Sequence, residues 1–189
     1  MNTAFVIDPT GTVVFTQGKC VPIQFFADGK PAQEQRLWDS PWGKVGICIC
    51  YDLSYTRVVD ELIRQGADLL IVPTMDVTAW GAQQHELHTR IAIARALEYH
   101  VPIVRVGSSG ISQIVAASGA EVARGHFPGQ GETVAANMNT LHGLPPHLPV
   151  DRMLAPICVG LTGIITAGLL GWNWRQQFRN WRSKRRQRK

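Results

Sequence analysis

The sequence predicts an α/β domain followed by one membrane-spanning helix, and two observations lead to this prediction. In residues 1–150, short apolar segments typical of strands alternate with amphipathic segments typical of helices. This order is characteristic of a largely parallel sheet covered by helices. In residues 153–174, 22 consecutive residues carry no formal charge, and a helix of that length crosses a hydrocarbon core of about 30 Å.

Each element of the first 150 residues follows from a local pattern. Two short apolar segments flank a turn at residues 8–11. Residues 56–65 place apolar side chains on one side and end at Gly66, a common helix stop. Residues 83–99 predict a second helix, whose apolar positions at helical spacing are Leu87, Ile91, Ala94 and Leu97. Strands are expected over residues 3–7, 12–15, 44–50, 68–72, 102–106 and 112–117.

Composition and charge separate the body of the chain from its tail. Of the 189 residues, 45% are hydrophobic and 17% are charged, which excludes a disordered chain and allows a sizeable core. Residues 175–189 hold 8 of the 19 Lys and Arg residues and no acidic residue. The body is therefore mildly acidic, and the net charge of +5 comes from the tail. The four cysteines lack the spacing of a disulfide framework.

The basic tail directly follows the apolar segment, with Trp172 and Trp174 at the boundary, where interfacial aromatic residues belong. A basic flank marks the cytoplasmic side of a span and favours contact with anionic lipid. The alternatives are a buried core helix and a nucleic-acid-binding tail. The long uncharged segment and the position of the tail favour the membrane, so no nucleic-acid partner is expected. The predicted organisation is a folded domain over 1–145, a linker over 146–152, a transmembrane helix over 153–174 and a cytoplasmic tail over 175–189.

Cys50 ends the apolar segment 44–50, shortly before a predicted helix. At a strand-to-helix turn, a thiol lies above the carboxyl edge of the sheet, where backbone N–H groups stabilise a thiolate and an oxyanion. The alternative is an inert packing cysteine. Cys48 shares the strand parity of Cys50, and His85 and His88 lie three residues apart, but neither pair has the further ligands that a metal site needs. We therefore expect no metal and no cofactor.

Five segments, in order along about two thirds of the chain, resemble motifs of the nitrilase, or carbon–nitrogen hydrolase, superfamily. The first is GICICYDLSYTR at residues 46–57, which is similar to the strand that ends in the family's nucleophilic Cys-Tyr-Glu or Cys-Tyr-Asp. The others are GADLLIVPT at 66–74, MDVTAWG at 75–81, ARALE at 94–98 and PIVRVGSSGIS at 102–112. The resemblance implies that residues 1–145 are the C-terminal portion of a nitrilase-like αββα sandwich.

The resemblance also implies a Glu-Lys-Cys triad, in which Glu is the general base, Lys stabilises the oxyanion and Cys forms a thioester. Cys50 corresponds to the nucleophile. Two registers are open for the lysine, one on Lys19 and the other on Gln17. We prefer Lys19, because a permanent cation near the thiol lowers its pKa and stabilises the oxyanion; the alternative is a solvated loop lysine. A second acidic residue of the family falls near Ala27 or Asp28.

Further roles come from the same resemblance. Tyr51 and Trp80 are expected to bind substrate, with core packing as the alternative for Trp80. Arg95 and Glu98 are expected to be structural, either paired at i, i+3 or bonded to buried polar groups.

The family's base Glu belongs to its N-terminal half, to which no segment here corresponds. We therefore expect this chain to be the C-terminal part of a larger protein, or a piece that needs a partner chain for that half. The order of half-domain, span and basic tail resembles the apolipoprotein N-acyltransferases, a membrane branch of the family. That resemblance implies acyl transfer from a phospholipid to the N-terminal amine of a lipoprotein, by an extracytoplasmic domain anchored in the inner cell membrane. The alternatives are a membrane-tethered amidase and an inactive anchored interaction module.

Overall fold

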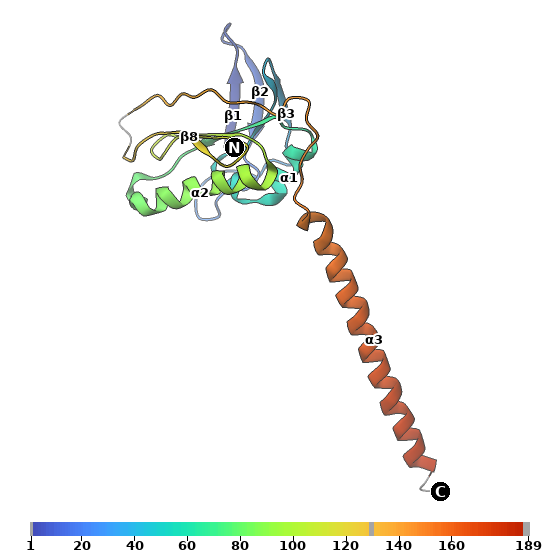
Figure 1. Cartoon of the computed structure of the whole chain (residues 1–189). Helices are drawn as coiled ribbons and strands as arrows, with labels where there is room; N and C mark the ends of the chain where they lie inside the picture. Colours follow the sequence, from blue (N-terminus) through green and yellow to red (C-terminus); the bar gives the residue numbers. More distant parts are fainter. Residues whose placement is uncertain (1, 129–130, 187–189) are drawn as a thin grey trace. The chain divides into compact units, whose positions relative to one another are not determined.

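The computed structural model describes residues 2–128 and 131–186, with the backbone alone for residues 180–186. The chain forms two compact units, Met1–Leu148 and Pro149–Lys189. The first is an α/β unit and the second is one long helix (Figure 1). The predicted α/β class is therefore confirmed, and the predicted span lies in a helix.

A six-stranded mixed sheet forms the centre of the α/β unit. Its middle strands β4, β5 and β6 are parallel, and the three outer pairings are antiparallel. The sheet is less parallel than predicted, because the connections near both ends are too short for a helical crossover. In sheet order, the strands are β3 (Leu37–Ser40), β4 (Gly43–Ile47), β5 (Leu69–Thr74), β6 (Ile103–Gly107), β7 (Gln113–Val115) and β8 (Glu121–Arg124).

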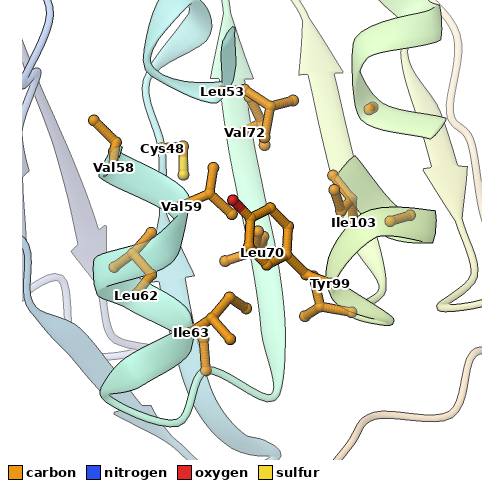
Figure 2. Packing of buried hydrophobic residues seen from close by; sticks show 14 of the residues in the cluster. Cys48, Leu53, Val58, Val59, Leu62, Ile63, Leu70, Val72, Tyr99 and Ile103 are labelled. Atoms are coloured by element: carbon orange, nitrogen blue, oxygen red, sulfur yellow. The ribbon is translucent and has the colours of Figure 1, made fainter. Parts of the chain in front are cut away.

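Helices α1 (Thr56–Arg64) and α2 (Gly81–Tyr99) pack against one face of this sheet. Leu62 of α1, Leu70 of β5 and Tyr99 of α2 are fully buried in that layer (Figure 2). Burial of a side chain the size of Leu stabilises the fold by about 1.5–3 kcal/mol. The layer therefore anchors the loops that leave the carboxyl ends of β4 and β5.

The position of α2 is as predicted, but its buried face is not the one formed by the larger apolar residues. The predicted apolar stripe was Leu87, Ile91, Ala94 and Leu97. Of these, Leu87 and Leu97 are 45% and 50% exposed, whereas Ala92 and Ala96 are fully buried. The buried face also holds His85, Thr89 and Tyr99, so the periodicity of apolar residues alone did not identify it.

A hairpin of β1 (Thr3–Ile7) and β2 (Val13–Gly18) packs against the opposite face of the sheet. Val6 and Phe15 turn inward, and the outward positions of the hairpin are mostly exposed. β2 runs three residues further than predicted. That extension brings the chain directly to Lys19.

Several strand boundaries differ from the prediction in ways that matter for the site. β4 ends at Ile47, and Cys50 opens the short 3₁₀ helix η1 (Cys50–Ser54) instead of closing the strand. β3 and β8 were not predicted, because each has four residues and carries charged side chains that hide any apolar alternation.

The second unit is the helix α3 (Asp151–Arg186), which contains the predicted span at residues 153–174. By length and composition, its stretch Asp151–Arg179 is apolar enough to cross a membrane. The most apolar part of that stretch is not buried against protein. Trp172 and Trp174, both exposed, lie toward its basic end.

Candidate active site

Cys50 lies in the turn that follows β4, where the chain changes direction before α1. Its φ is 51°, which is the left-handed region that residues with a Cβ rarely adopt. The turn is held from both sides: Cys48 N–H donates to the Ile71 carbonyl at 3.1 Å, and Asp52 N–H donates to the Ile49 carbonyl at 3.1 Å. The backbone thus presents the thiol of Cys50 above the end of β4, while Cys48 is fully buried beneath it.

The carboxylate of Asp52 ties this turn to the segment that carries Lys19. One oxygen accepts the N–H of Val21 at 2.7 Å and that of Cys20 at 3.1 Å, and the other accepts the N–H of Ile49 at 3.1 Å. Asp52 is fully buried. Burial raises the pKa of Asp52, against the opposite effect of these amide hydrogen bonds. A single side chain therefore fixes both candidate catalytic segments.

Lys19 follows β2 and is almost completely buried. Its Nζ donates to Asp28 Oδ2 at 2.5 Å. Asp28 also accepts the side-chain amide of Asn2 at 2.6 Å and the N–H of Ile23 at 3.0 Å. Burial acts to raise the pKa of Asp28, but the hydrogen bonds from Lys19, Ile23 and Asn2 outweigh it and lower that pKa. Of the two positions considered for the family's second acidic residue, it is therefore Asp28 that lies beside Lys19.

Gln17, the other candidate for the lysine position, has a different role. Its side-chain N–H donates to the carbonyls of Gly18 and Glu34 at 2.9 Å, and its oxygen accepts the N–H of Arg36 at 3.1 Å. The side chain of Gln17 is therefore occupied in holding the 34–36 segment. Lys19, in contrast, borders a cavity together with Cys50.

The two large cavities that Cys50 borders have volumes of about 490 and 660 Å³. The first also contains Lys19 and Asp28 in its wall, and the second contains Tyr51. Trp80 borders both. The two cavities share Ile23, Phe26, Cys50 and Trp80. Most of the side chains around them are apolar, so the space beside the thiol fits an apolar or amphipathic molecule.

The charge environment of Cys50 differs from the prediction in its net effect. Burial raises the pKa of Cys50, and the carboxylate of Asp76 acts in the same direction. Lys19, the amide of Met75 and Arg105 act to lower that pKa, but burial outweighs them. The cation was expected to depress the pKa of the thiol below its ordinary value. Burial therefore favours the protonated thiol, which must lose its proton to an acceptor to react as a thiolate.

A buried polar cluster lies next to this site, and the sequence patterns did not reveal it. Asp76, fully buried, pairs with Arg105 and with Nδ1 of His88 at 3.0 Å. Burial acts to raise the pKa of Asp76, but the contacts with His88 and Arg105 lower it. His85 lies beside the same carboxylate without a hydrogen bond to it: its Nδ1 is 3.8 Å from Asp76 Oδ2, and its Nε2 is 3.2 Å from the Val77 carbonyl. Within residues 2–128 and 131–186, no group of three His, Cys, Asp or Glu side chains is arranged to hold a metal ion.

Arg95 and Glu98 have the structural role expected of them. They form an ion pair, and Arg95 also donates to the carbonyls of Leu53 and Ser54, each at 3.0 Å. These carbonyls are at the end of η1. Helix α2 thereby holds the far side of the turn that begins at Cys50.

The family model that describes carbon-nitrogen hydrolases matches residues 1–143. The chain belongs to this family. Solved structures of similar fold include a nitrilase-superfamily protein, Nit3, from Saccharomyces cerevisiae, with a TM-score of 0.57, 23% identity, and coverage of 70% of this chain and 50% of that chain. A variant of an amidase from Nesterenkonia sp. AN1, with acrylamide added at its active-site cysteine, has a TM-score of 0.60, 18% identity, and coverage of 71% and 56%. At these identities, the likeness shows the fold alone.

Curated relatives have more than one activity. An apolipoprotein N-acyltransferase from Geobacter metallireducens is 24% identical over 148 residues, which are 68% of this chain and 27% of that protein. An omega-amidase, NIT2-B, from Xenopus laevis is 24% identical over 171 residues, which are 80% of this chain and 61% of that protein. The chain thus spans about a quarter of the length of the N-acyltransferase that it matches.

Proposed function

We propose that this chain carries the nucleophile and the oxyanion-binding cation of a membrane-anchored N-acyltransferase. The reaction would move an acyl group from a phospholipid to the N-terminal amine of an apolipoprotein. The observation that carries the proposal is that Cys50 and Lys19 border one largely apolar cavity. The apolar helix α3, which follows the α/β unit in the chain, would tether it to the bilayer, where both substrates reside.

The first half of the reaction acylates Cys50. The sulfur attacks the carbonyl carbon of the donor ester, and the negative charge that develops on the carbonyl oxygen is stabilised by the ammonium group of Lys19. The bond from the carbonyl carbon to the ester oxygen then breaks. The alcohol leaves with the proton that the thiol gave up, and a thioester remains on Cys50.

Cys50 and Lys19 do not supply a base that accepts the thiol proton during this first half of the reaction. Among the described residues that border the first cavity, Asp28 is the carboxylate, and it is bonded to Lys19. The family resemblance implies a glutamate from the N-terminal half of the domain. We therefore propose that a further segment of the protein, or a partner chain, brings this glutamate to Cys50.

The cavities and α3 favour acyl transfer over the hydrolysis of small amides. Trp80 and Tyr51 stand in the walls as candidates for contact with an acyl chain. With the basic tail in the cytoplasm, the α/β unit would lie on the outer side of the inner membrane. An amidase is the second candidate, because the match to the omega-amidase covers 80% of this chain and most of that relative.

The test uses protein isolated from its own host through a tag in the C-terminal tail, so that any preceding segment or partner chain is retained. It is reconstituted in phosphatidylethanolamine vesicles with alkyne-labelled acyl chains, and a synthetic diacylglyceryl-cysteinyl peptide is added. We expect labelled peptide to form, to be lost in Cys50→Ala and to be retained in Cys158→Ala, which removes an exposed thiol of α3. Cleavage of small amides without labelled peptide would assign an amidase, and an unlabelled protein would leave an inactive anchored module.

A further inference from the structure

The imidazole of His88 is held by a buried carboxylate and borders the same cavities as the candidate nucleophile. Nδ1 lies 3.0 Å from Asp76 Oδ1, and Asp76 is fully buried and paired with Arg105 through its other oxygen. An ionised carboxylate can only accept, so Nδ1 carries the hydrogen of the neutral ring. Nε2 then holds the free lone pair, and the hydrogen bonds of the described residues leave it without a protein partner.

The position of the ring connects it to the thiol. His88 borders the 660 Å³ cavity together with Cys50. Both residues also border a small cavity of about 20 Å³, which has room for one water molecule. Trp80 packs edge-on against the ring at 5.7 Å between centroids. The imidazole is thus fixed through Nδ1 by a buried carboxylate and borders two cavities that Cys50 also borders.

We propose that His88, held by Asp76, accepts the proton of the amine that attacks the Cys50 thioester. This inference rests on the proposed function and assigns a residue to the second half of that reaction. The amine nitrogen bonds to the carbonyl carbon while its proton passes to Nε2 of His88, directly or through one water. The bond from carbon to sulfur then breaks, and the proton returns from Nε2 to the Cys50 thiolate. Thiol and neutral imidazole are both regenerated.

The other histidine of this helix segment, His85, lies in different surroundings. Nε2 of His85 lies 3.2 Å from the Val77 carbonyl, and its ring is stacked on Phe127 at 4.0 Å. His85 is also completely buried, whereas the side chain of His88 is 23% exposed. Of the two histidines, only His88 borders a cavity that also contains Cys50.

The decisive variant is His88→Asn, because the Asn side-chain amide reproduces the donor at Nδ1 for Asp76 but carries no base at the position of Nε2. Rapid-quench measurements on the reconstituted protein follow release of the lysophospholipid and decay of the labelled thioester separately. We expect the first rate to stay within about twofold and the second to fall about 100-fold, as is typical for loss of a general base. Hydroxylamine, which is unprotonated at neutral pH, should restore most of the decay rate. Arg90→Gln, on an exposed part of the same helix, is the control and should change neither rate.

Equal slowing of both steps, an unchanged thioester decay, or no rescue by hydroxylamine would overturn the role of His88 while leaving Cys50 as nucleophile. A protein without substitutions that forms no thioester at all would overturn the proposed function, and this inference with it. The two failures are therefore distinguishable in one set of experiments.

Discussion

The substitution Asp52→Asn should open the turn at Cys50 without removing any candidate catalytic group. The carboxylate serves three backbone donors with two oxygens, and the shortest bond is to Val21 at 2.7 Å. An Asn side chain keeps one acceptor, which we expect to remain toward Val21 and Cys20. Its NH₂ group then faces the N–H of Ile49. Two donors oppose each other there, and because the site is fully buried, water cannot replace the lost acceptor.

A buried donor that loses its partner costs about 1–3 kcal/mol. Taking about 2 kcal/mol, and 1.4 kcal/mol per tenfold change in an equilibrium constant, local opening should become about 30-fold more frequent. Hydrogen–deuterium exchange of the full chain in lipid nanodiscs measures this directly in peptides that cover residues 48–54. Asp60→Asn is the matched control, because Asp60 is also buried but bonds to Tyr99 at 2.6 Å, away from the turn. Unchanged protection of residues 48–54 in Asp52→Asn would refute the role assigned to Asp52.

Three further predictions concern the cation, the core and α3. Lys19→Met should slow alkylation of Cys50 by iodoacetamide at pH 8 by about tenfold, because loss of the cation raises the pKa of the thiol further; an unchanged rate contradicts the electrostatic effect of Lys19 on the thiol. Leu70→Ala should lower the free energy of unfolding by about 2–5 kcal/mol, measured by tryptophan fluorescence, whereas Leu87→Ala on the exposed face of α2 should cost much less. Ile164→Arg should cost about 2.5–3.5 kcal/mol of membrane insertion, so carbonate extraction should release more protein; equal retention would argue against a span.

Much of the fold could be predicted from local patterns, and the exceptions have physical reasons. The strand before Cys50 and both helices of the α/β unit follow from runs of apolar residues and from helix stops. The buried face of α2 does not, since Ala92 and Ala96 pack inward while larger residues remain exposed. That face also includes the polar side chains of His85 and Thr89, which a periodicity of large apolar side chains does not report.

The candidate site could be predicted only in part, because some of its contacts depend on the three-dimensional fold. Cys50 and Lys19 could be located because each belongs to a motif with local spacing. The bonds of Asp52 to residues about 30 positions earlier in the chain depend on how β2 and β4 come together. The pKa of the Cys50 thiol also depends on burial, which raises it by more than the cation of Lys19 lowers it. Asp76 and Arg105 lie in two of the quoted motif segments, but their pairing was missed because it joins the loop after β5 to β6.

The most direct test of the account asks which of the four cysteines becomes acylated. Protein isolated from its own host, with any preceding segment or partner retained, is incubated with labelled phospholipid, quenched in acid and mapped by tandem mass spectrometry. We predict a hydroxylamine-labile acyl group on Cys50 and none on the fully buried Cys48. An acyl group on another cysteine, or none on any cysteine in repeated experiments, would contradict the claim that Cys50 is the nucleophile.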